Sequence, residues 1–214
     1  MKIKITLLTL LFVCVCMLPA FGQSEKKAGS DKKAGSMKKT DTAAVTEEAK
    51  EPLMIAVAEK QLMFEATGDW KSVKPKSRML EFEVQVPKVE GDKADGRMTI
   101  MGAGGSIEAN IQRWEGQFSQ PDGSATEAKT KEMTVDDMKV TMVDVTGSFT
   151  QTMGGPFSGG KKVTSPDQRM LAAIVQTPKS GNYFIKLVGP AATIKANEGE
   201  FEKMIKGAKL SKKE

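Results

Sequence analysis

The sequence predicts an α+β fold in which helices pack on an antiparallel sheet. Three observations support this prediction. Residues 79–101 contain two apolar segments on either side of a polar loop, as the two strands of a hairpin do. Residues 170–188 contain a second such pair around a short turn. A segment with helical periodicity follows each pair, and no βαβ repetition occurs, so the strands are expected to pair antiparallel.

The N-terminus has the three parts of a secretory signal peptide, over residues 1–22. Lys2 and Lys4 supply the positive start, an apolar run of 14 residues follows, and the small residues Ala20 and Gly22 precede the expected cleavage site. The run is shorter than the roughly 20 apolar residues of a membrane-spanning helix. We therefore expect an exported protein, periplasmic or secreted, without a transmembrane anchor after cleavage.

Cysteine and histidine usage excludes several kinds of site. The only cysteines, Cys14 and Cys16, lie in the signal peptide, and each follows a valine rather than the small residue that lipidation needs. The mature chain can therefore form no disulfide and no thiolate metal site. The chain has no histidine, which excludes Ser-His-Asp hydrolysis and histidine-based zinc sites. We predict no catalytic, metal or cofactor residues, although carboxylate, lysine or cofactor chemistry stays open.

Residues 23–52 are expected to form a disordered Lys-rich linker, because they contain few bulky apolar side chains. Seven lysines and five acids interleave over residues 23–50, which favours a flexible spacer over a basic arm that touches acidic envelope polymers or anionic lipid head groups. A single domain is expected over residues 53–214. Residues 51–214 hold 23 basic and 22 acidic side chains, so no nucleic-acid partner is predicted.

The first half of the domain is expected to contain a strand, a hairpin and a helix. Apolar side chains alternate with Glu81, Glu83 and Gln85, which indicates a strand with one buried and one wet face. Ser106 fits an N-cap position. The apolar positions after it share one helical stripe: Ile107, Ile111, Trp114 and Phe118. The predicted elements are the strands 61–70, 79–87 and 97–101, the polar loop 88–96, and the helix from 106 to about 121.

The second half is expected to contain two hairpins and a helix. Residues 170–177 are continuously apolar, as in a central, well-covered strand. Pro190 fits the first position of the last helix, Gly199 weakens its middle and Gly207 fits its C-cap. The predicted elements are the strands 131–134, 138–147, 170–177 and 182–188, the glycine-rich loop 148–167, and a helix whose apolar face carries Ile194, Phe201, Ile205 and Ala208.

Taken together, these elements resemble the PsbP-like fold over residues 53–210. The resemblance rests on the strand before Trp70, the hairpin 79–101, the helix with Trp114, and the late hairpin followed by a helix with Phe201. The segments RMTIMGAGGSIEANIQRWEGQF and RMLAAIVQTPKSGNYFIKLVGP are similar to those of uncharacterised exported proteins from planctomycete-type bacteria. The resemblance implies a non-catalytic, protein-binding role, and it implies no binding residue.

Two glycine-rich segments are candidate binding sites. Residues 155–161 match G-x-x-x-x-G-K, but Lys162 replaces the Ser or Thr of a phosphate-binding loop and no helix follows, so a mobile loop is the better interpretation. Because the loop is long, Phe157, Lys161 and Lys162 are our candidate contact residues.

Residues 102–106 lack the third glycine of a dinucleotide-binding fingerprint. The segment is expected to be a tight strand-to-helix turn, with Gly104, Gly105 and Ser106 as a weaker candidate for capturing an anion. Glu90, Asp92 and Asp95 do not match a calcium-loop pattern, and the scattered methionines favour core filling over copper binding.

The leading functional hypothesis is an exported, non-catalytic binding or accessory module whose partner is another envelope or exported protein. Two alternatives stay open. One is a small-ligand carrier or carboxylate-dependent enzyme that uses the sheet face. The other is an envelope-adhesive protein that uses the basic arm at residues 23–50. The sequence predicts no oligomeric state.

Overall fold

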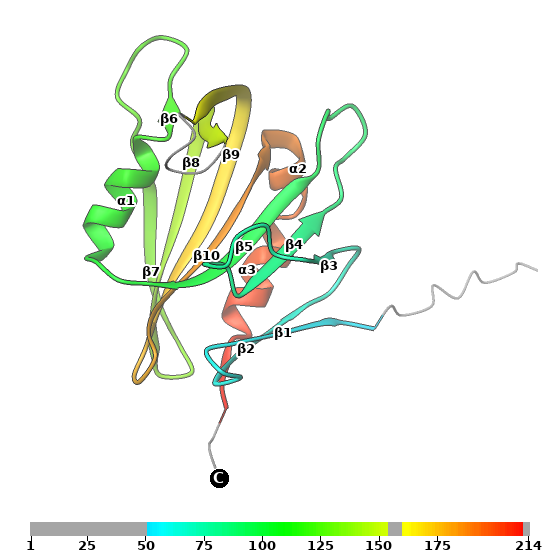
Figure 1. Ribbon diagram of the computed structural model, residues 1–214, viewed down its shortest axis with the longest axis vertical. Coiled ribbons are helices and arrows are strands. Elements are labelled where there is room, and N and C mark those ends of the chain that lie inside the picture. Colours follow the sequence, from blue (N-terminus) through cyan, green and yellow to red (C-terminus); the bar gives the residue numbers. More distant parts are fainter. Residues whose placement is uncertain (1–50, 154–159, 212–214) are drawn as a thin grey trace, which may run out of the picture. The chain divides into compact units, whose positions relative to one another are not determined.

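The structure is a computed structural model that describes residues 51–153 and 160–211. Over these residues the chain forms two antiparallel sheets and three helices (Figure 1). The predicted α+β class, an antiparallel sheet packed with helices, is confirmed. None of the described helices is both long enough and apolar enough to cross a membrane.

The large sheet has the strand order β3-β4-β5-β10-β9-β8-β6, with β7 paired to β8, and every pairing is antiparallel. The predicted hairpins form its centre: β4 pairs with β5, and β9 with β10. Met170–Val175 is buried without interruption, as predicted for a central strand. The strands are β3 (Lys71–Val73), β4 (Phe82–Val86), β5 (Gly96–Ala103), β6 (Phe118–Ser119), β7 (Lys129–Val135), β8 (Met138–Met153), β9 (Lys161–Thr177) and β10 (Gly181–Pro190).

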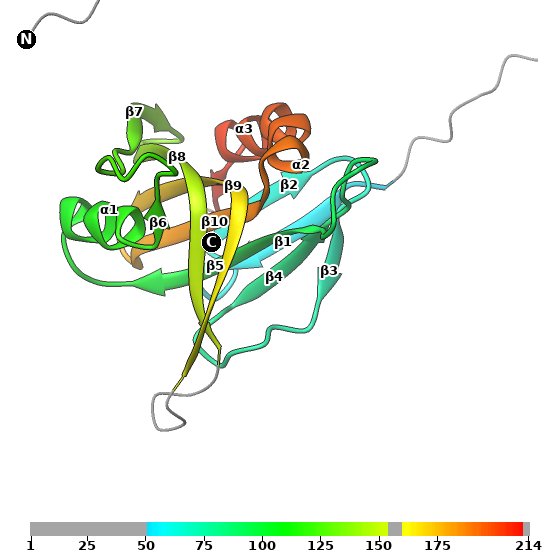
Figure 2. The ribbon, with the colours of Figure 1, turned by 90° about the horizontal axis from the view of Figure 1, so that it is seen from above.

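One face of the large sheet packs against a small sheet and two helices. The small sheet has the order β1-β2-β11. Phe64 of β2, Phe201 of α3 and Ile185 of β10 are all fully or almost fully buried in the same hydrophobic cluster. The elements that supply this main core are β1 (Leu53–Val57), β2 (Leu62–Ala66), β11 (Lys209–Leu210), α2 (Ala191–Ala196) and α3 (Glu198–Lys206). Figure 2 shows α2 and α3 together on this side.

The opposite face carries α1 (Ile107–Glu115) and a smaller hydrophobic cluster. The Ser106 hydroxyl accepts a hydrogen bond from the Ala109 N–H at 3.1 Å, which confirms the predicted N-cap. Trp114 packs edge-on against Phe184 of β10, with ring centroids 5.5 Å apart. Trp114 is therefore a core anchor. The helix ends at Glu115, earlier than predicted, and Phe118 is buried from β6 rather than from a helical stripe.

The predicted loop at 148–167 is wrong over most of its length. β8 continues to Met153 and β9 starts at Lys161, so both strands run through the segment. The pairing shifts at a bulge between Gly147 and Phe149, and Gly147 has φ +143°. The Gly, Ser, Thr and Pro content predicts a loop, whereas residues 148–153 and 161–167 form a bulged two-stranded extension.

The last helix is two helices. α2 and α3 meet at Asn197, whose Nδ2 donates to the Thr193 carbonyl at 2.9 Å. Gly199 is not the break; it lies inside the first turn of α3. Pro190 ends β10 and caps α2 instead of occupying its first position. Gly207 is the C-cap of α3, as predicted.

The predicted wet face of the strand at 79–87 also needs correction. β4 starts at Phe82, and Glu83 is only 2% exposed. Arg97 of β5 explains this burial, because its Nε lies 2.7 Å and its Nη2 3.1 Å from the two Glu83 carboxylate oxygens. This bidentate pair lowers the pKa of Glu83, against the opposing effect of burial. A buried acid thus stands where the alternation alone predicted a solvated one.

Candidate functional site

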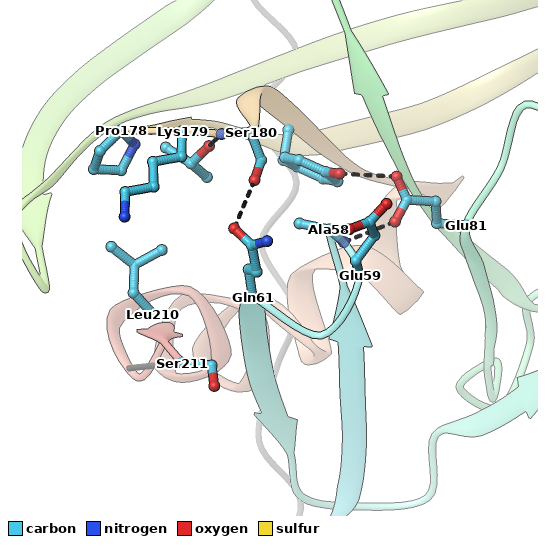
Figure 3. Close-up of a pocket in the computed structure, with 11 residues that line it drawn as sticks. Ala58, Glu59, Gln61, Glu81, Pro178, Lys179, Ser180, Leu210 and Ser211 are labelled. Carbon is cyan, nitrogen blue, oxygen red and sulfur yellow. Dashed lines mark hydrogen bonds between the residues drawn. The ribbon is translucent and has the colours of Figure 1, made fainter. Parts of the chain in front are cut away.

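An open cleft of about 870 Å³ lies where three connections of the chain meet. The turn between β1 and β2 forms one wall, the turn between β9 and β10 forms another, and the end of β11 lines a third side (Figure 3). The cleft is lined by Ala58, Glu59, Gln61, Glu81, Thr177, Pro178, Lys179, Ser180, Tyr183, Leu210 and Ser211. Both polar and apolar groups line it, which is typical of binding sites.

The β1–β2 turn is conformationally strained. Ala58, Glu59 and Lys60 have φ values of +56°, +54° and +67°. Non-glycine residues in this left-handed region each cost on the order of 1 kcal/mol and persist only where the surroundings hold them. Here Glu81 accepts the Ala58 N–H at 2.8 Å, and Gln61 donates its N–H to the Ala58 carbonyl at 2.9 Å. Strain of this kind concentrates at functional sites, so the turn singles out this end of the domain.

Glu81 and Tyr183 form the polar centre of the cleft. The Tyr183 hydroxyl donates to Glu81 at 3.0 Å, while the other Glu81 oxygen is the one that accepts the Ala58 N–H (Figure 3). Burial of the phenol, and then its bond to Glu81, raise the pKa of Tyr183 to about 12. Tyr183 therefore stays protonated at neutral pH and acts as a donor. Gly102 lies behind the pair, where a Cβ would be 3.5 Å from the Tyr183 hydroxyl.

A second hydrogen bond spans the cleft. The Ser180 hydroxyl donates to the Gln61 side-chain carbonyl at 3.2 Å (Figure 3). The Gln61 backbone carbonyl accepts the Ser211 N–H at 2.8 Å. Gln61 thus ties the β9–β10 turn to the chain after β11. An amide cannot take a proton from Ser180, so this pair is not a nucleophile and its general base. The arrangement can bind polar groups, and it offers no activated hydroxyl.

The cleft also carries two carboxylates. Figure 3 shows Glu59 and Glu81 on the same side of it, with Lys179 across from them. Glu59 and Glu81 are both exposed, and both Glu81 oxygens already accept hydrogen bonds. No group of three or more carboxylate, histidine or cysteine side chains that could hold a metal ion occurs in the part of the chain that the structure describes.

The residues proposed from the sequence lie elsewhere. Lys161 and Lys162 are exposed at the start of β9, and neither lines the cleft. Phe157 lies outside the described residues. The two lysines therefore belong to a strand and not to the loop in which they were expected.

The candidate anion-binding turn is closed by its own chain. Asn110 donates to the Gly104 carbonyl at 3.3 Å and to the Ser106 carbonyl at 2.8 Å, and Gly105 has φ +94°. Glu108 adds a negative charge to the first helical turn. These contacts account for the turn as a strand-to-helix connection, and its anion capture stays a prediction.

Sequence reasoning missed the residues of the cleft. Tyr183 is the only tyrosine of the chain, and it stands in a strand beside a turn. The alternating pattern of residues 79–87 places Glu81 on a solvent-exposed strand face. Neither position has a sequence signal that links it to the other, because 102 residues separate them. The sheet topology brings them together.

No family model and no curated protein matches this chain. Among solved structures, it is similar to the cyanobacterial PsbP protein (CyanoP) of Synechocystis sp. PCC 6803, with 10% identity and a TM-score of 0.48; the match covers 75% of this chain and 92% of that one. It is also similar to a structure from Bacteroides thetaiotaomicron VPI-5482, with 12% identity and a TM-score of 0.37, covering 75% of this chain and 48% of that one.

The first of these structures carries the name of the fold that the sequence resembles. The predicted similarity to exported proteins of planctomycete-type bacteria has no counterpart in these comparisons and stays a prediction.

Proposed function

We propose that this protein is an exported, non-catalytic binding module that contacts another envelope or exported protein through the cleft between the β1–β2 and β9–β10 turns. The main observation in support of this proposal is the cleft. It is open, strained at one wall, and lined by side chains that bond to one another as donors and acceptors. The signal-peptide features of residues 1–22 support export.

Site-specific photo-crosslinking tests the proposal. A photoreactive amino acid replaces Lys179, which is exposed at the rim of the cleft, in the mature chain expressed in its source organism. The matched control carries the same group at Lys131, an exposed position on β7 outside the cleft. We expect one crosslinked protein at position 179, suppressed by excess unlabelled protein, and none at 131.

A second variant links this contact to the cleft. Gln61→Ala removes the bond to Ser180, and we expect it to weaken the crosslink at 179 without unfolding the domain. Equal crosslinking at both positions, or robust hydrolase turnover by the mature protein, would rule the proposal out. Cell fractionation with and without residues 1–22 tests export independently.

A small-ligand carrier or a carboxylate-dependent enzyme is the second candidate, because Glu59 and Glu81 both line the cleft. A metabolite screen by thermal shift, repeated with Glu81→Gln, tests it. A ligand that stabilises the wild-type protein and not the variant would favour this function over protein binding.

The envelope-adhesive alternative concerns residues 23–50, which lie outside the described residues. If the protein stays in the envelope after residues 23–50 are deleted, the envelope-adhesive alternative is wrong.

A further inference from the structure

A partly buried lysine without a carboxylate partner lies on the face of the large sheet that carries α1. Lys186 of β10 donates to the Gln117 side-chain carbonyl at 2.5 Å. Its ammonium lies 5.7 Å from the ring centroid of Trp114 and 5.4 Å from that of Phe149. None of the ion pairs among the described residues includes Lys186. Buried charges are normally paired, so neutral groups alone hold this one.

Two arginines stand near this lysine. Lys186 pairs in register with Thr99, and Val188 with Arg97, so Arg97 is a diagonal neighbour of Lys186 on the same face. Arg113 projects from α1, where its Nη2 donates to Asn110 at 2.7 Å. Burial, and then the positive charges of Arg113 and Arg97, lower the pKa of Lys186 to about 8.

Only one acid faces this cluster from the strands around it. Glu83 of β4 occupies the same row as Thr99 and Lys186, and both of its oxygens are taken up by Arg97 and by the Lys76 N–H. Thr99 of β5, Ala172 of β9, Phe149 of β8 and Gln117 are the other neighbours, and all are uncharged. Counted over these strand neighbours, three cations therefore face one acid, whose two oxygens are already occupied.

Donors remain available in the cluster. Within the described part of the chain, Nη1 of Arg97 and Nη1 of Arg113 make no hydrogen bond, and Lys186 uses one of its three N–H groups. The Arg97 side chain is 45% exposed and Arg113 is exposed, so solvent reaches these donors.

The surrounding surface extends the positive field. Residues 71–80 contain no acid, and their basic side chains Lys71, Lys74, Lys76 and Arg78 are all exposed. Lys71 pairs with Gln85, which pairs with Arg97, so Lys71 points to the same side of the sheet. The Lys76 N–H donates to Glu83 at 2.9 Å, which holds the β3–β4 loop against this face. Such a field concentrates anions.

We propose that Lys186, Arg97 and Arg113 form a binding site for an oxyanion group, a phosphate or a carboxylate, on the α1 side of the large sheet. Such an anion would accept hydrogen bonds from the unused N–H groups of these three side chains and neutralise positive charge without displacing Glu83. The ring faces of Trp114 and Phe149 position the ammonium. This site is separate from the cleft, and it does not depend on the proposed function.

NMR titration of the Lys186 ε-CH₂ group tests the proposal directly in the mature wild-type protein. The probes are inorganic phosphate and succinate, added at constant ionic strength. Because a bound anion favours the ammonium, we expect the pKa of Lys186 to rise as either probe is added, by linkage. An unchanged pKa with both probes would overturn the proposal.

Three variants locate the site. Lys186→Met and Arg113→Gln are each expected to weaken phosphate binding by about tenfold, the effect of one charge-assisted hydrogen bond. Lys131→Gln, an exposed lysine of β7, removes the same charge elsewhere and is expected to change little. Equal losses in all three variants would mean non-specific attraction and would overturn the site. Should Lys186→Met not fold, the wild-type titration still decides.

Vesicles distinguish the two sources of the oxyanion. The mature protein is cosedimented with phosphatidylcholine vesicles that contain or lack phosphatidylglycerol. Binding to the anionic vesicles that Lys186→Met reduces would assign the site to a lipid head group. Phosphate binding without vesicle binding would assign it to a soluble anion. Vesicle binding that Lys186→Met leaves intact, together with no response to phosphate or succinate, would contradict the proposal.

Discussion

Replacing Lys186 by methionine is expected to stabilise this protein at neutral pH. Burial and the charges of Arg113 and Arg97 lower the pKa of Lys186 from 10.5 to about 8. At pH 7 the folded state therefore holds an ammonium that its surroundings disfavour. Methionine has a similar length, carries no charge, and packs well against aromatic rings such as Trp114 and Phe149.

The pKa values set both the size and the pH window of this effect. The lowering of the Lys186 pKa from 10.5 to about 8 corresponds to about 3 kcal/mol. Cation–π contacts with the two rings stabilise the ammonium by on the order of 1 kcal/mol. We therefore expect Lys186→Met to raise the free energy of unfolding by about 1–3 kcal/mol. Between pH 8 and 10.5 the unfolded lysine is protonated and the folded one is not. The wild type therefore gains stability as pH rises through this window.

Urea unfolding of the wild type and of Lys186→Met between pH 7 and 10.5 measures the effect. The difference in unfolding free energy isolates Lys186, because the other lysines titrate alike in both proteins. We expect the advantage of the variant to shrink steadily above pH 8. An advantage that is constant across this range, or a variant less stable than the wild type at pH 7, would refute the reasoning. Ionisation of Tyr183 lowers the stability of both proteins as pH rises above 10, because the pKa of Tyr183 is raised in the folded state.

Two further predictions concern the backbone and a buried acid. Gly147→Ala should destabilise the protein by about 2 kcal/mol or more in urea unfolding, since φ is +143° and a Cβ would lie 2.7 Å from the Ser119 carbonyl oxygen. Gly199→Ala is its control; it lies in α3 with open space around it and should stabilise by about 0.5–1 kcal/mol. A stabilising Gly147→Ala or a destabilising Gly199→Ala would contradict the assignment for that glycine. Glu83→Gln should lower the free energy of unfolding by about 1–2 kcal/mol at pH 7. The effect is modest because the partner, Arg97, is half exposed and solvent screens the ion pair. The lowered pKa of Glu83 means that its stabilisation is present above pH 4.5 and lost as pH falls further, so acid unfolding curves of variant and wild type should converge; parallel curves would argue against it.

Short-range patterns in the sequence predicted most of the sheet. Alternation and continuous apolar runs located β4, β5 and the buried part of β9, because the pleat and burial act directly on those residues. The patterns failed at residues 148–167, where Gly, Ser, Thr and Pro make strand and loop look alike. There the pairing of Phe149 with Ser165, made through a bulge, decides the structure.

Long-range partners could not be predicted. The sequence pattern predicts a solvated Glu83, but in the structure Arg97 pairs with it. The pattern also predicts an exposed Lys186, but in the structure Trp114 of α1 packs against it. The cleft shows the same limit, since its centre joins residues that are far apart in the chain. What a polar side chain does in this domain depends on strand order, which composition and periodicity do not encode.

The two polar sites differ in what a ligand must do to bind. In the cleft, Glu81, Tyr183, Gln61 and Ser180 already satisfy one another, so a ligand has to replace existing bonds or fill apolar space beside them. A large partner surface can meet that demand better than a small polar molecule, which favours protein binding there. At Lys186 the charge is uncompensated, so an anion adds interactions and displaces only water. Anion binding on that face should therefore raise the stability of the domain, while occupation of the cleft leaves the pKa of Lys186 unchanged.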